Sequence, residues 1–199
     1  VEESDLLLFP DPETLSVLPW RPQQGKVIRL FCDIRKPDGA PFEGDSRYIL
    51  KKTVEKYEKL GYSVNVGPEC EFFLFETDSD GKPLLKPHDN ADYLAVAPFD
   101  KGENIRREIC LTMEEMGFVI EASHHECAVG QHEIDFRYTS PLGAADNFVT
   151  FKTVVKTVAG RSGLYASFMP KPLNGISGSG LHINLSVRNA PSSFTDDPL

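Results

Sequence analysis

Residues 68–75 read Pro-Glu-Cys-Glu-Phe-Phe-Leu-Phe, and this stretch determines which face of the predicted sheet carries carboxylates. Its aromatic and apolar residues predict a β-strand, in which side chains two residues apart share a face. Glu69 and Glu71 therefore lie on one face, which Phe73 and Phe75 continue. Like charges repel and desolvation adds to the cost, so a bound cation would offset both effects. Taken alone, the pair fits an exposed strand edge with two solvated glutamates at least as well.

Helices and further strands are predicted on both sides of this strand. Helical spacing of apolar residues, with capping residues and glycine stops, predicts helices at 45–60, 105–116 and 141–161. Residues 77–82 form a predicted hairpin tip, and the stretch from there to residue 100 reads as a loop. Predicted strands, of which 26–34 looks central, lie at 6–9, 26–34, 118–122, 131–138, 165–169 and 180–187. The strands come partly in hairpin-like pairs rather than in strict βαβ alternation, which favours an α+β fold with helices on one side of the sheet. We expect this sheet to be largely antiparallel and curved.

Composition limits the classes of function. The 199 residues include 30 acidic and 21 basic side chains, giving a formal charge of −9, which argues against nucleic acid or an anionic membrane as partner. Hydrophobic residues make up 40%, too many for a disordered chain. The four cysteines show no Cys-x-x-Cys or zinc spacing and are expected to be free and mostly buried. No apolar run approaches the roughly 20 residues of a membrane span, so a cytoplasmic protein is expected.

Two more strands alternate in the same way. In residues 181–187 the apolar side chains are expected to face helices and the polar ones a cleft; the polar set is His182, Asn184 and Ser186. In residues 131–137 one face is polar, and an ordinary solvated face explains it equally well; this set is Gln131, Glu133, Asp135 and Arg137. The adjacent His124 and His125 cannot share a strand face, which argues against a site made by the two histidines together.

Taken together, these strands supply four carboxylates and one imidazole. Such a set suits Mg²⁺ or Mn²⁺ better than zinc, which prefers cysteine and more histidine. Because Mg²⁺ usually bridges carboxylates to substrate phosphates, the set points to phosphoryl chemistry on ATP. The glycine-rich loop 175–180 lacks the phosphate-loop pattern. Its glycines would let backbone amides approach an anionic group, although a plain turn explains them as well.

Four stretches of sequence occur in an order that is specific when they are taken together. They are the N-terminal Ser4-Asp-Leu, Phe9-Pro-Asp-Pro-Glu-Thr14 and Leu18-Pro-Trp20; Gly67–Phe75; Glu121–Glu126 with Gly130–Glu133; and Lys171-Pro with Gly178–His182. In this order they resemble the catalytic domain of type I glutamine synthetase over nearly the whole chain. The resemblance implies an ATP-dependent ligase that forms glutamine from glutamate and ammonia through γ-glutamyl phosphate, with two or more Mg²⁺ or Mn²⁺ ions per site.

The resemblance also implies roles for individual residues. One metal would be held by Glu71, Glu126 and Glu133, and a second, which polarises the γ-phosphate of ATP, by Glu69 and His182. The positions that match the nucleotide pocket are Glu121, Tyr138 and Ser186. Those that match the loop around substrate glutamate are Ser177 and Gly178. Two positions depart from the family's usual residues, since Ser177 stands where asparagine is frequent and Asn184 where histidine is frequent.

Residues 1–199 are expected to form part of a catalytic domain, because the chain starts at Val1 and stops just after a strand-like run. The resemblance implies a preceding β-grasp domain, a later catalytic segment and a parent homododecamer with sites between subunits. We expect this segment to be inactive alone. Two alternatives stay open: a ligase that joins glutamate to a polyamine or another amine, and a relative that keeps the fold without catalysis.

Overall fold

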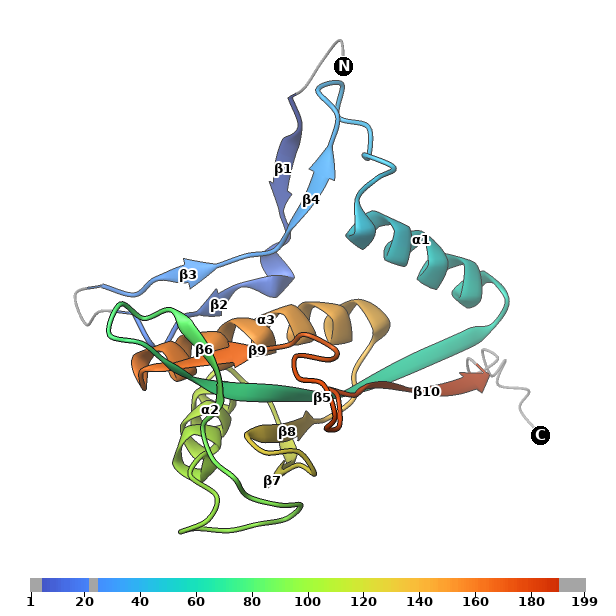
Figure 1. The fold of residues 1–199 in the computed structure, drawn as a ribbon. Coiled ribbons are helices and arrows are strands. Elements are labelled where there is room, and N and C mark those ends of the chain that lie inside the picture. Colours follow the sequence, from blue (N-terminus) through green and yellow to red (C-terminus); the bar gives the residue numbers. More distant parts are fainter. Residues whose placement is uncertain (1–4, 22–24, 190–199) are drawn as a thin grey trace.

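The computed structural model describes residues 5–21 and 25–189, so Ser4, the first residue of the N-terminal motif, lies outside the described part. A six-stranded sheet is organised around β5 (Tyr62–Thr77), and every pairing in it is antiparallel. Strand β5 pairs with four others along its length, and β7 extends the sheet beyond β8 (Figure 1). These strands are β6 (Pro83–Pro87), β7 (Ile120–His125), β8 (Gln131–Phe136), β9 (Leu164–Ser167) and β10 (Leu181–Asn189). The predicted antiparallel α+β architecture is confirmed.

The three predicted helices are present, with bounds within two residues of those predicted. Helix α1 follows Asp45, whose side chain accepts a hydrogen bond from the amide of Arg47, and α3 follows Ser140, which caps it in the same way. Gly61 ends the first helical segment with a φ of 81°, a conformation that suits glycine. The helices are α1 (Ser46–Lys59), α2 (Glu103–Glu115) and α3 (Pro141–Arg161).

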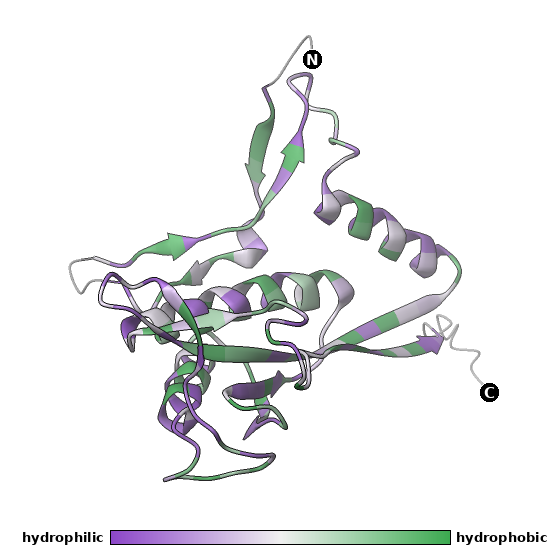
Figure 2. Cartoon of the chain, in the orientation of Figure 1, coloured by the Kyte–Doolittle hydropathy of each residue, from purple (hydrophilic) through white to green (hydrophobic). Residues whose placement is uncertain are grey.

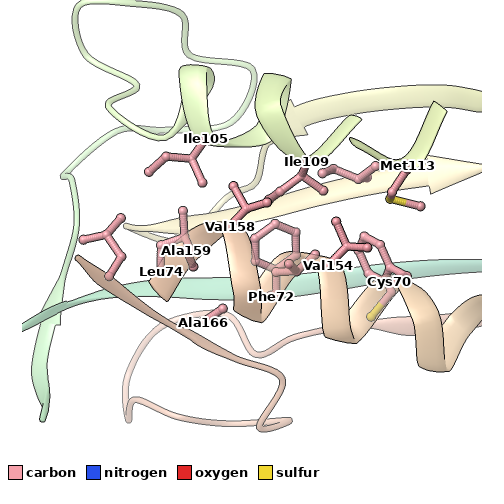
Figure 3. Packing of buried hydrophobic residues seen from close by; sticks show 14 of the residues in the cluster. Cys70, Phe72, Leu74, Ile105, Ile109, Met113, Val154, Val158, Ala159 and Ala166 are labelled. Carbon is pink, nitrogen blue, oxygen red and sulfur yellow. The ribbon is translucent and has the colours of Figure 1, made fainter. Parts of the chain in front are cut away.

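The core forms on the face of β5 opposite its glutamates. Cys70, Phe72 and Leu74 are buried and pack against α2 and α3, where Ile109, Met113, Val154 and Val158 meet them (Figure 3). Phe73 and Phe75 lie on the other face in a smaller cluster with Ala128 and the loop before β10. The alternation predicted for this strand is therefore confirmed, and no helix of the described residues covers the face with Glu69 and Glu71.

The prediction of a central strand at 26–34 is wrong. This segment is divided into β3 (Ile28–Arg29) and β4 (Cys32–Arg35), which pair with β2 (Ser16–Val17) and β1 (Leu7–Pro10) in two small sheets. The division follows from Phe31, whose amide donates to the Thr14 hydroxyl and whose carbonyl accepts from the amide of Asp11. These bonds fasten the segment to the N-terminal 3₁₀ turn, Pro12–Thr14, instead of the large sheet, and β1 and β4 project from the body (Figure 1).

Three smaller expectations also need correction. The stretch after the hairpin tip contains β6, which pairs with β5, and the strand predicted at 118–122 lies at 120–125. All four cysteines are free as predicted, but only Cys70 is buried, and Cys127 is exposed. Among the described residues, no helix combines the length and hydropathy needed to cross a bilayer.

The apolar face of β10 does not face helices as predicted. Leu181, Ile183, Leu185 and Val187 are each about half exposed or more. Helix α1 packs near the first half of β5 and leaves a groove of about 570 Å³ between itself and β10. Its apolar lining comes from both elements and includes Leu50, Val54, Leu185 and Val187. Apolar positions alternate with polar ones along β10 (Figure 2). The position of α1, which sequence periodicity does not determine, leaves this face uncovered within the described residues.

Candidate metal and nucleotide site

Strand register brings the predicted carboxylates together on the helix-free face of the sheet. Glu71 is the register partner of Glu133, and Glu69 is the register partner of both Asp135 on β8 and His182 on β10. Potential ligand atoms of Glu69, Glu133 and His182 all lie within 4.8 Å of one another. A second set with the same spacing consists of His124, Glu126 and Glu133. Glu133 therefore belongs to both sets and lies between two candidate cation positions.

The electrostatics of Glu133 show how crowded this face is. Its residue is 7% exposed, and burial, followed by the negative charges of Asp135 and Glu126, raises its pKa to about 8. Burial and then the nearby Glu69 also raise the pKa of Asp135. The solvated face considered for residues 131–137 is therefore wrong at Gln131 and Glu133, which are both buried. Buried carboxylates in mutual repulsion are the oxygen-rich surroundings that a hard divalent cation fits.

Glu71 is held by the glycine-rich loop. Its Oε2 atom accepts a hydrogen bond of 2.9 Å from the amide of Gly180 and another from the side-chain amide of Gln131. Gln131 also donates to the carbonyl of Gly178 at 2.9 Å. A Cβ atom on Gly180 would lie 2.6 Å from the Glu71 carboxylate, and one on Gly178 would lie 2.4 Å from the carbonyl oxygen of Pro170. The absence of a side chain at Gly180 thus permits close packing against the Glu71 carboxylate, and at Gly178 against the Pro170 carbonyl. The loop therefore holds Glu71 in addition to reversing the chain.

Glu126 is oriented by its own hairpin. The pKa of this carboxyl is lowered: burial opposes the shift, but hydrogen bonds from the Cys127 amide and from His124 outweigh it. The Nε2 atom of His124 lies 2.9 Å from Glu126 and 3.2 Å from Glu133. Sequence reasoning gave His124 no role, although strand alternation together with the register places it on the face of Glu133. His125 points the opposite way into the interior, as expected for adjacent residues of a strand.

The three residues predicted to line a nucleotide pocket do surround one cavity. It has a volume of about 420 Å³ and lies beside Glu69; its lining includes Glu121, Tyr138 and Ser186. Asn184 and Arg188 also line it, and the sequence had not indicated Arg188. Asn184 donates to Glu69 Oε1 at 2.8 Å, while His182 Nδ1 lies 3.2 Å from Glu69 Oε2. Of the predicted glutamate-loop pair, Ser177 is exposed next to Gly178.

A family profile described as glutamine synthetase, catalytic domain, matches residues 43–198. The chain belongs to the glutamine synthetase family. It is 57% identical over 198 residues to a glutamine synthetase of Clostridium saccharobutylicum, and 53% identical over 199 residues to one of Staphylococcus aureus. These matches cover 99% and 100% of this chain but 45% of each relative, so the chain spans less than half the length of these synthetases.

The fold agrees with this membership. The solved structure of Plasmodium falciparum glutamine synthetase superposes with a TM-score of 0.84 at 27% sequence identity. The match covers 95% of this chain and 42% of that synthetase chain. The similarity thus extends to the arrangement of the strands that carry Glu69, Glu71, Glu133 and His182, which confirms the fold that the resemblance implied.

Proposed function

We propose that the protein containing this chain joins ammonia to the γ-carboxylate of glutamate, using ATP and divalent metal ions, to form glutamine. The observation that carries the proposal is Glu133, a buried carboxylate with a pKa raised to about 8 that belongs to two candidate ligand sets. Two adjacent cations would neutralise these clustered carboxylates and could draw the donor phosphate and the acceptor carboxylate together. Membership in the glutamine synthetase family supports the same reaction.

The residues divide into two ligand sets for Mg²⁺ or Mn²⁺. We assign Glu126 and Glu133 to one ion and Glu69 with His182 to the other, with Glu133 close to both. We add Glu71 to the first ion because it lies opposite Glu133 in the strand register, although it belongs to neither group of closely spaced ligand atoms. These oxygen-rich sets fit hard cations, and the single imidazole of each neighbourhood does not favour zinc. When bound, the ions supply Lewis-acid polarisation and screen the repulsion between donor phosphate and acceptor carboxylate. Asn184 holds one oxygen of Glu69, which leaves the other directed at His182.

The two substrates would approach this face from opposite sides. Glu69 both lines the cavity of about 420 Å³ and belongs to a ligand set, so ATP bound there through Glu121, Tyr138 and Ser186 would bring its phosphates to the carboxylates. Glutamate would lie near Ser177 and Gly178, on the Glu71 side. The γ-phosphoryl group would move from the bridging oxygen of ATP, which leaves with ADP, to an oxygen of the glutamate γ-carboxylate. Ammonia would then attack the acyl carbon of γ-glutamyl phosphate, and phosphate and one proton would be released.

The assembly belongs to the proposal as well. We infer that residues 1–199 are part of a catalytic domain within a cytoplasmic homododecamer whose sites lie between subunits. Supporting it, the matched synthetases are more than twice as long as this chain, and the carboxylate face is open to solvent at His182, whose side chain is 63% exposed. Residues from outside this chain would then complete the site, so the 199 residues alone should not catalyse the reaction.

A second acceptor is favoured by one specific observation. Ser177 and Asn184 replace residues that are usual in the family, and they lie at the glutamate loop and at Glu69. A γ-glutamyl ligase for a polyamine or another amine would share the metal chemistry and differ in the acceptor.

The test uses the full-length protein with ATP, glutamate and Mn²⁺, and a panel of ammonia, methylamine, putrescine and spermidine. Glutamine formation with ammonia as the preferred acceptor supports the proposal. Preference for an amine supports the second candidate, and the absence of ADP release with every acceptor, while Mn²⁺ still binds, supports the non-catalytic relative.

A further inference from the structure

A buried ionic network lies directly behind the carboxylates, on the helix-facing side of the β7–β8 hairpin. His125 and His132 are register partners there, and both are fully buried. Asp89 and Asp100, from the segment that precedes α2, and Arg106, from α2 itself, are also buried and meet these histidines. The same pair of strands thus carries ligand candidates on one face and this network on the other.

The network is not a second cation site, although its geometry would admit one. Ligand atoms of Asp89, Asp100, His125 and His132 lie within 4.8 Å of one another. However, the guanidinium of Arg106 lies 2.8 Å from Asp100 Oδ2 and 2.8 Å from His132 Nδ1, so a positive charge is already in place. The His132 ring also packs so closely on Gly102 that a Cβ there would lie 2.4 Å from it. Arg106 therefore supplies the positive charge that a bound metal ion would otherwise supply to these side chains.

Asp89 links three separate segments of the chain. Its Oδ1 atom accepts from His125 Nε2 at 3.0 Å and from the amide of Gly130 at 2.9 Å, and its Oδ2 atom accepts from the amide of Lys101 at 3.2 Å. His125 Nδ1 lies 2.7 Å from the carbonyl oxygen of Glu126. Both ring nitrogens of His125 lie within hydrogen-bonding distance of an acceptor, so the ring connects Asp89 to the backbone of Glu126. The connection ends on the backbone of Glu126, at one side of the hairpin tip.

We propose that Asp89 and His125 are positioning residues that hold the tip of the β7–β8 hairpin so that Glu126 and Glu133 converge. The inference rests on the proposed function, since it concerns the same carboxylates. Such contacts are needed because neighbouring carboxylates repel each other and because a hairpin tip is the part of a sheet that opens most easily. A buried polar pair of this kind rarely adds net stability over well-packed apolar side chains, which points to geometry as its benefit.

The experiment compares Asp89→Asn with Asp146→Asn in the full-length protein. Asp146 pairs with Arg47 between α3 and α1, its side chain is 15% exposed, and it lies apart from the carboxylate face, so its loss controls for removal of a partly buried, ion-paired charge. Amide hydrogen exchange of residues 124–133 is measured without metal, and Mn²⁺ affinity is measured by electron paramagnetic resonance. For Asp89→Asn we expect about tenfold faster exchange across the tip and Mn²⁺ binding weakened about 10–100-fold. Asp146→Asn should change neither.

Unchanged exchange and unchanged Mn²⁺ affinity in Asp89→Asn overturn the inference. If that variant does not fold, His125→Gln is measured in the same way, because glutamine keeps a donor toward Asp89 and loses the bond to the Glu126 carbonyl. Failure of both variants to fold, while Asp146→Asn folds, assigns the pair to global stability and also overturns it. Because hydrogen exchange is read without substrate, a wild-type protein that makes no glutamine refutes the proposed function without deciding this inference.

Discussion

Glu71 and Glu133 lie directly opposite each other in the antiparallel register of β5 and β8, with both carboxylates on the helix-free face of the sheet. Like charges placed directly across two strands destabilise a sheet. Gln131 and the Gly180 amide stabilise Glu71 by donating to it, whereas Glu133 is buried among Asp135, Glu126 and Glu71. Without metal, a proton on Glu133 therefore relieves this repulsion below about pH 8, and a bound cation would take the place of that proton.

The first prediction concerns the pH dependence of stability without metal. The pKa of Glu133 is about 8 in the folded state, and an unfolded glutamate titrates near 4.3. Between these values the native protein binds more protons than the unfolded one, so this group's stabilising contribution is full below about pH 4 and is lost as pH rises to 8. Glu133→Gln in EDTA should therefore lose less stability between pH 5.5 and pH 8 than wild type, in urea titrations at each pH. Equal losses would contradict the assignment.

A second prediction tests Glu71 as a ligand. Glu71→Gln keeps the shape of the side chain and removes its charge, so Mn²⁺ affinity should fall about tenfold or more. Glu76→Gln is the matched control, because Glu76 lies on the same strand but pairs with Lys86 at the surface. Isothermal titration of Mn²⁺ into both full-length variants measures the difference. Equal affinities would show that Glu71 serves only the glycine-rich loop.

Asn184 provides a third prediction through its bond to Glu69. Removing this 2.8 Å hydrogen bond frees a carboxylate oxygen to rotate, so Asn184→Ala should weaken Mn²⁺ binding about 3–10-fold. Asn189→Ala, on the opposite face of the same strand, should leave it unchanged. The KM for ATP is measured alongside, since Asn184 also lines the neighbouring cavity. An undiminished Mn²⁺ affinity would assign Asn184 to the nucleotide alone.

The fourth prediction contrasts two glycines. Gly178→Ala would place a Cβ 2.4 Å from the Pro170 carbonyl oxygen, so the loop must shift, at a cost of about 1–3 kcal/mol and a higher KM for glutamate. Gly160→Ala, on the exposed side of α3 with no atom within 4 Å of the new Cβ, should raise the free energy of unfolding by about 0.5–1 kcal/mol. Denaturant titrations and steady-state kinetics check both, and a stable Gly178→Ala with an unchanged KM would contradict the loop's proposed role.

Much of the fold was predictable because its signals are local. Helix α3 was predicted with its observed bounds, since Ser140 and Pro141 start it and apolar spacing carries it to Arg161. Strand 26–34 was predicted wrongly, because its apolar composition does not reveal that Phe31 bonds to Thr14 and Asp11. The N-terminal segment decided that outcome, and no local pattern encodes a contact of this kind.

The same distinction applies to the candidate site. Alternation along residues 68–75 and 131–137 determined which side chains share a face, because successive side chains of a pleated strand point to opposite faces. Only the tertiary structure decided that Glu71 meets Glu133, that His124 lies between Glu126 and Glu133, and that Asp89 clamps the hairpin from behind. These pairs depend on strand register or, for Asp89 and His125, on contact between segments 36 residues apart. Sequence specifies the face, and packing of the whole sheet specifies the partner across it.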